Sequence, residues 1–174
     1  MYLFKRAKLA LFAVAAVLLV TACNKANDTE KVTANHQSEQ SKIIDLTVFK
    51  HPSCGCCQDW IDHMESQGFS TKATNTEQLG SIKQEHGIAP NHSSCHTAVS
   101  PQGYVFEGHV PAKFVKQFLK EAPQDAIGLA VPAMPVGSPG MEMGDQFMPY
   151  KVLLLKTDGS VEVFADIQNY QEQF

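Results

Sequence analysis

The segment Cys54-Gly55-Cys56-Cys57 places three of the chain's five cysteines within four positions. Residues 44 to 48 before it alternate apolar and polar side chains, as a half-buried strand does. After it, the apolar residues Cys57, Trp60, Ile61 and Met64 recur on one face of a helix. The motif therefore joins a strand to a helix, with Cys57 facing inward. The unpaired N–H groups of a helix start favour thiolates at Cys54 and Cys56.

Further elements follow in regular order. We expect a strand at 69–74, a helix around residues 79–87 that begins with a capping box of Thr74 and Glu77, a strand after Cys95, a strand at 104–107, and a helix entered through Pro111. This order, β-α-β-α-β-β-α, is thioredoxin-like and predicts an α/β fold. An unrelated α+β sandwich is the alternative. In the thioredoxin-like layout, Cys95 precedes the third strand and faces the motif.

The chain continues beyond Pro123 with a Met-, Pro- and Gly-rich segment, residues 128–148, which predicts a loop with defined turns. Residues 150–156 and 161–164, joined around Asp158-Gly159, predict a β-hairpin. The fold class is thus thioredoxin-like α/β with a C-terminal loop and hairpin extension.

The N-terminus carries three basic residues and then an apolar run from Leu9 to Val20, which predicts a secretory signal. The run ends in residues 19–23, which resemble the bacterial lipobox, so Cys23 is the predicted lipidation site. An ordinary signal peptide with a chance cysteine is the alternative. Asn24, in place of Asp, favours the outer membrane. We therefore predict a signal peptide at 1–22, a polar tether at 23–42 and one metal-binding domain at 43–174 in a periplasm-facing lipoprotein.

Without residues 1–22 the chain has 11 Lys and Arg against 18 Asp and Glu, a formal charge of −7. This acidic balance argues against nucleic acid as a partner. It suits a cation better, although exported domains are also kept soluble in this way.

Four cysteines remain besides Cys23: Cys54, Cys56, Cys57 and Cys95. Two structural disulfides are one interpretation, in which Cys54 and Cys56 pair separately with Cys57 and Cys95. A redox pair of Cys54 and Cys57 is a second interpretation, in which these two would be the catalytic residues. A metal site is the third, and it uses all four thiols.

Thiolates select Cu(I) or zinc, and thioethers favour copper. Met141 and Met143, with Met134 and Met148 nearby, supply such thioethers, although each could instead fill a core gap. Zinc fits less well, since its sites usually use two separated C-x-x-C knuckles. Among the histidines, His51, His92, His96 and His109 are candidate ligands or supporting donors, with His96 first. The predicted metal ligands are Cys54, Cys56, Cys57, Cys95, His96, Met141 and Met143.

Three groups of residues carry a family resemblance: the cysteine motif with Trp60, His63 and Met64; residues 94–98 with residues 103–104 and 107–111; and residues 128–142. Together they are similar to the CopG-like periplasmic copper-resistance proteins, over nearly all of residues 44–165. The chain departs from the family pattern at Ala133, where Gly is expected, and Ala resists the positive φ that Gly allows.

The resemblance implies a thioredoxin-like domain that binds copper through its clustered cysteines and contributes to copper tolerance, with copper redox chemistry as an added activity. Copper carriers, exporters and redox proteins of the periplasm are the expected partners, besides copper ions and the membrane that holds the anchor. Two other functions stay open: a thiol-disulfide oxidoreductase that uses Cys54 and Cys57, and a structural lipoprotein held by two disulfides.

Overall fold

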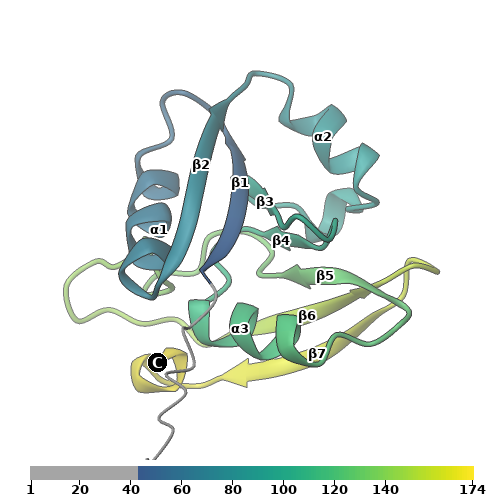
Figure 1. Cartoon of the computed structure of the whole chain (residues 1–174). Coiled ribbons are helices and arrows are strands. Elements are labelled where there is room, and N and C mark those ends of the chain that lie inside the picture. Colours follow the sequence, from purple (N-terminus) through teal and green to yellow (C-terminus); the bar gives the residue numbers. More distant parts are fainter. Residues whose placement is uncertain (1–42) are drawn as a thin grey trace, which may run out of the picture. The chain divides into compact units, whose positions relative to one another are not determined.

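A mixed sheet of seven strands forms the centre of the part of the chain that the structure, a computed structural model, describes, residues 43–174 (Figure 1). The strand order is β2-β1-β3-β4-β5-β6-β7. The strands are β1 (Ile44–Lys50), β2 (Phe69–Asn75), β3 (His96–Val99), β4 (Val105–Glu107), β5 (Ala126–Ala130), β6 (Tyr150–Lys156) and β7 (Val161–Ile167). The predicted signal peptide, lipidated Cys23 and tether lie outside the described residues.

Three α-helices accompany these strands within residues 43–174: α1 (Gly55–Ser66), α2 (Leu79–Glu85) and α3 (Ala112–Lys120). Two short 3-10 turns, η1 (Pro90–His92) and η2 (Tyr170–Gln173), complete the secondary structure. β1 is parallel to β2 and antiparallel to β3, and β4 is parallel to β5. The order from β1 to α3 is the predicted β-α-β-α-β-β-α, and the predicted hairpin is the antiparallel pair β6 and β7.

Two local predictions are wrong. The predicted loop at 128–148 begins too early, because residues 128–130 belong to β5. This strand pairs with β4 and β6 and so joins the hairpin to the main sheet. The capping box of Thr74 and Glu77 is absent, because Thr74 is still part of β2 and the cap residue of α2 is Gln78, which makes no side-chain cap bond.

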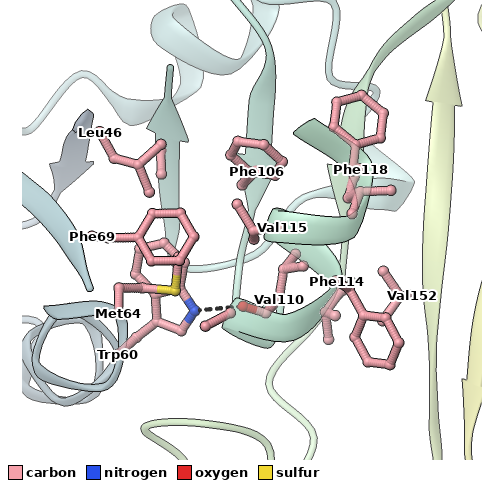
Figure 2. Packing of buried hydrophobic residues seen from close by; sticks show 14 of the residues in the cluster. Leu46, Trp60, Met64, Phe69, Phe106, Val110, Phe114, Val115, Phe118 and Val152 are labelled. Atoms are coloured by element: carbon pink, nitrogen blue, oxygen red, sulfur yellow. Dashed lines mark hydrogen bonds between the residues drawn. The ribbon is translucent and has the colours of Figure 1, made fainter. Parts of the chain in front are cut away.

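The main hydrophobic core lies between one face of the sheet and the helices α1 and α3 (Figure 2). The predicted inward face of α1 is confirmed, since Cys57, Trp60, Ile61 and Met64 are all buried. The indole Nε1 of Trp60 donates a hydrogen bond of 2.9 Å to the carbonyl of Val110, which satisfies its polar atom inside the core. Each such large apolar side chain contributes roughly 1.5–3 kcal/mol by burial, so this core holds the start of α1 firmly.

A smaller apolar cluster includes Ile88, Val105, Ala130 and Leu155. Val105 and Phe106 are neighbours in β4 but belong to different clusters, as expected for a strand whose two faces are both covered. Among the described residues, no helix is long and apolar enough to cross a membrane.

Candidate metal and redox site

The cysteine motif lies at the N-terminus of α1, as predicted. Cys54 is the residue that precedes the helix, and its N–H donates to the carbonyl of His51, which closes a tight turn after β1. Cys56 and Cys57 are in the first helical turn, where backbone N–H groups have no helical partner. Cys57 is fully buried, whereas Cys54 and Cys56 are half-buried. The motif thus has one sulfur inside the core and two toward solvent.

Cys54 and Cys57 form a disulfide, with their Cα atoms 5.4 Å apart. Cys56 and Cys95 are free thiols, and both are half-buried. The sulfur of Cys56 lies 3.6 Å from that of Cys54. The structure therefore shows one oxidised pair with two thiols beside it. This arrangement differs from the interpretation with two structural disulfides.

Cys95, immediately before β3, lies against the motif, where the sequence analysis placed it. The sulfur atoms of Cys54, Cys56, Cys57 and Cys95 all lie within 4.8 Å of one another. The sulfur of Cys57 is also 3.8 Å from the carbonyl oxygen of Cys95. Once the Cys54–Cys57 disulfide is reduced, four thiolates this close together would suit a soft metal ion, and the same closeness allows thiol-disulfide exchange.

Two histidines contact the sulfur of Cys95. Nδ1 of His96 lies 3.3 Å from it, and Nε2 of His109 lies 3.0 Å from it. Cys95, His96 and His109 together form a second group whose ligand atoms are within 4.8 Å of one another. His109 was one of the four histidines predicted as candidate ligands or supporting donors, behind His96, and the structure places both His96 and His109 against the Cys95 sulfur. The signal in the sequence was its position two residues after Glu107, just beyond the end of β4.

The tautomer of His109 follows from its surroundings. Its Nδ1 is 2.8 Å from the carbonyl oxygen of Pro139, which can only accept a hydrogen bond, so Nδ1 carries the proton. Nε2 therefore presents its lone pair to Cys95. The ring of His96 is fully buried between Trp60 and His109, and its Nε2 is a buried polar atom without a hydrogen-bond partner among the described residues.

Burial controls protonation at this site. It lowers the pKa of His96 well below its ordinary value and also lowers the pKa of His109. Burial, with a further contribution from the nearby Cys56, raises the pKa of Cys95 to about 12. At neutral pH the metal-free site therefore holds a Cys95 thiol between two neutral imidazoles. Neutral imidazole is the form that binds metal ions, and binding would displace the thiol proton.

A buried ion pair fixes the backbone next to Cys95. The carboxylate of Glu107 is fully buried and accepts a hydrogen bond of 2.6 Å from the N–H of Ser94. It also accepts one of 2.6 Å from the hydroxyl of Thr97 and pairs with the ammonium of Lys83 on α2. A buried charge needs such partners. The network holds the segment that carries Cys95 and was not predicted from the sequence.

The loop after β5 covers the start of α1. Gly140 is so close to the first turn that an added Cβ would lie 2.6 Å from the Trp60 nitrogen and 2.8 Å from the Cys56 carbonyl oxygen. Met141 follows directly and is half-buried. Met143 is 55% exposed. The two predicted thioether ligands therefore differ, because Met141 is half-buried next to Gly140 in the sequence and Met143 lies largely in solvent.

The remaining histidines named from the sequence lie apart from the sulfur contacts. His51 is exposed and its Nδ1 is 2.7 Å from the hydroxyl of Ser53. Nε2 of His92 is 3.0 Å from the side-chain amide of Asn91.

Comparisons with known proteins give a consistent result. Residues 92–141 match a family model described as "Protein of unknown function, DUF411". Two solved structures match with a TM-score of 0.69 each. One, "Copper resistance protein copG- Form 2", is 38% identical and the match covers 73% of this chain and all of that chain. The other, "Copper resistance protein copG- Form 1", is 39% identical over 74% of this chain and all of that chain. No curated protein matches.

Proposed function

Because the chain belongs to the CopG copper resistance protein family, as its sequence motifs indicated, we propose that it binds Cu(I) through the sulfurs of Cys54, Cys56, Cys57 and Cys95 and so contributes to copper resistance. The observation that carries this proposal is the gathering of all four sulfurs within 4.8 Å. Reduction of the Cys54–Cys57 disulfide frees the full set of thiolates, and soft thiolates favour Cu(I).

In this proposal, His96 and His109 add neutral nitrogen donors beside Cys95, and Met141 adds a thioether from the loop that covers α1. Met143, which lies largely in solvent, is a donor that meets incoming copper ions. Zinc fits the same thiolates but gains nothing from thioethers. The similarity to copper resistance proteins supports copper.

A titration of the reduced full-length protein with Cu(I), without oxygen and against a chromogenic Cu(I) chelator, tests this function. The expected result is tight binding of one or more copper ions with a thiolate-to-copper absorption in the ultraviolet. Cys56→Ser should lower the copper stoichiometry or affinity. Cys23→Ser is the matched control, since it replaces a cysteine that is not one of the four proposed ligands and should leave both unchanged. Unchanged binding in Cys56→Ser contradicts the proposal.

A second candidate function, thiol-disulfide exchange, rests on the disulfide between Cys54 and Cys57. Half-buried Cys54 is the attacking thiol in this mechanism, and buried Cys57 resolves the mixed disulfide. The β-α-β-α-β-β-α order and the order β2-β1-β3-β4 in the sheet support a thioredoxin-like scaffold for it. Reduction of a small disulfide in the presence of a metal chelator measures this activity. Cys54→Ser should abolish it and Cys56→Ser should retain it.

The proposed location of the protein is the periplasmic side of the outer membrane. Residues 1–22 are the proposed signal peptide, Cys23 the lipid anchor and 23–42 the tether. The protein's expected partners there are copper carriers, exporters or redox proteins. Metabolic labelling of the expressed protein with a radioactive fatty acid tests the anchor. Label in the wild type and none in Cys23→Ser is the expected result.

A further inference from the structure

Two thiols remain next to the disulfide of Cys54 and Cys57. Cys56 and Cys95 are both free and half-buried, and their sulfurs belong to the group within 4.8 Å of one another. They come from separate segments, the first turn of α1 and the residue before β3. Cys56 and Cys57 are adjacent in sequence, so a bond between them would form a strained ring. With Cys57 already bonded to Cys54, Cys95 is the remaining partner for Cys56 within residues 43–174.

Little movement is needed to join them. A disulfide requires the sulfurs to approach to about 2 Å, and rotation about χ1 moves a cysteine sulfur by comparable amounts. Both side chains have one side toward solvent, so rotation does not require the core to open. The backbone on each side is held, by the α1 turn for Cys56 and by Glu107 through the Ser94 N–H for Cys95.

We propose that Cys56 and Cys95 are a second redox pair, which closes after Cys54–Cys57, so that the site has three states with four, two and no thiols. A small-molecule disulfide is the oxidant. Cys56 attacks one of its sulfurs, forms a mixed disulfide and releases one small thiol. Cys95 then attacks the Cys56 sulfur, forms the Cys56–Cys95 bond and releases the second small thiol. Two protein thiols are oxidised and one small disulfide is reduced.

The consequence for copper rests on the proposed function. Each closed pair removes two thiolates from the cluster. Oxidation then lowers the capacity for Cu(I) in two steps, and the fully oxidised site retains only nitrogen and thioether donors. The chain would thus bind copper under reducing conditions and release it as both pairs close.

Peptide mapping of the full-length protein tests the second pair. The reduced protein is treated with increasing glutathione disulfide, remaining thiols are alkylated, and the protein is digested with trypsin. Cleavage after Lys50, Lys72, Lys83 and Lys113 places Cys54, Cys56 and Cys57 on the peptide 51–72 and Cys95 on 84–113. Cys23 lies on another peptide and does not interfere.

The expected result is peptide 51–72 with an internal disulfide and an alkylated Cys56 at low oxidant, then 51–72 linked to 84–113 at high oxidant. The product expected at high oxidant has a Cys54–Cys57 disulfide inside peptide 51–72 and a second disulfide that joins 51–72 to 84–113. Neither Cys56→Ser nor Cys95→Ser should form this product. The proposal is overturned if, at the highest oxidant, Cys54–Cys57 is closed while Cys56 and Cys95 still react with the alkylating reagent or carry only glutathione.

Cu(I) titration of the reduced protein, of the protein at low oxidant and of the protein at high oxidant, each before alkylation and digestion, separates this proposal from the function it builds on. A stepwise loss of Cu(I) binding supports both. Linked peptides from a protein whose fully reduced form binds no Cu(I) support the second redox pair and contradict the proposed function. If the protein with both disulfides closed binds as much Cu(I) as the reduced protein, oxidation does not lower the Cu(I) capacity in two steps.

Discussion

Ala133 has a backbone conformation that Ala rarely adopts. Its φ is 60°, and among residues 43–174 it is the only residue other than glycine with positive φ. Its N–H donates to the carbonyl of Ser93, and its own carbonyl accepts from the hydroxyl of Ser94, so the loop and the Cys95 segment hold it there. The family pattern predicts Gly at this position, and Gly adopts positive φ without the steric cost that Ala has. The two hydrogen bonds keep this conformation in spite of the side chain.

Ala133→Gly should therefore stabilise the protein. A left-handed conformation costs about 1–2 kcal/mol for Ala, and the greater freedom of Gly in the unfolded chain offsets about 0.4–1 kcal/mol of the gain. The expected net increase in the free energy of unfolding is roughly 0.5–1 kcal/mol, measured by urea denaturation. Ala89→Gly is the matched control, because Ala89 has φ of −68°. Ala89→Gly should be less stable than the wild type. If Ala133→Gly is also less stable than the wild type, Ala133 is not strained by its positive φ.

His63 connects α1 to α3 in its neutral form. Its Nε2 accepts a hydrogen bond of 3.2 Å from the N–H of Ala112, at the start of α3, and its ring contacts Phe174. Burial lowers the pKa of His63, and the nearby ammonium of Lys116 lowers it further. A protonated Nε2 could not accept this bond, so protonation and folding oppose each other.

The lowered pKa of His63 sets the direction of a pH effect. The unfolded chain takes up the proton near the ordinary pKa of about 6.5, while the folded chain does so only at lower pH. The stability contributed by neutral His63 is thus full above about pH 6.5 and is lost as pH falls through the folded pKa. Urea denaturation at about pH 7.5 and pH 5 should show a smaller pH-dependent loss in His63→Gln than in the wild type. Equal losses would contradict this role.

At the scale of elements, the contact between the loop after β5 and α1 shapes the site. Gly140 permits it, because φ is 81° and an added Cβ would meet backbone atoms of Trp60 and Cys56 that cannot move aside. Through this contact the loop also brings the Pro139 carbonyl to His109. One close approach of backbones therefore sets both the path of the loop that carries Met141 and the tautomer of His109.

Gly140→Ala should separate the loop from α1. Overpacking costs about 1–3 kcal/mol, in addition to the cost of positive φ. Gly144→Ala is the matched control, since Gly144 also has positive φ, 58°, but open space around it. Gly140→Ala should lose more unfolding free energy than Gly144→Ala and should bind Cu(I) more weakly in the chelator titration. Equal effects of the two variants would mean that the contact does not support the site.

Elements with a strong local pattern could be predicted from the sequence, and those that depend on distant neighbours could not. The apolar face of α1, for example, follows from a local pattern and is confirmed. β5 was missed because Gly128 interrupts its short apolar run. The structure explains this glycine, since a Cβ there would collide with the Val105 carbonyl on the parallel neighbour β4. That collision depends on strand pairing, which no local pattern reports.

The same distinction applies to the candidate site. The thioredoxin-like order placed Cys95 against the motif, because strand order alone fixes that position. The contact of Cys95 with His109 also depends on the path of the loop at Pro139, and the bond from Ser94 to Glu107 depends on the pairing of β3 with β4. Both join residues at least 13 positions apart, so the sequence analysis could name these residues as members of motifs but not assign their contacts.

At the scale of the whole molecule, the buried pair of Lys83 and Glu107 connects α2 to the cysteine site through the sheet. Side chains of Lys83 and Glu107 are 10% and 0% exposed. The carboxylate also holds Thr97 on β3 and the N–H of Ser94. Removing one charge from a buried pair leaves the other unpaired, which costs about 3–5 kcal/mol, whereas replacing both is often close to neutral.

A double-mutant cycle on this pair separates two roles of Glu107, which are to stabilise the fold and to position the segment that carries Cys95. Lys83→Met and Glu107→Gln should each lower the free energy of unfolding by about 3–5 kcal/mol, and the double variant should lose clearly less than their sum. Because the amide introduced by Glu107→Gln retains an oxygen for the Ser94 N–H, this double variant should bind Cu(I) as the wild type does. Lys83→Met with Glu107→Leu lacks that oxygen, so the segment with Cys95 should loosen and Cu(I) binding should weaken even where the protein remains folded. Equal copper affinity in both double variants would show that Glu107 stabilises the fold without positioning Cys95.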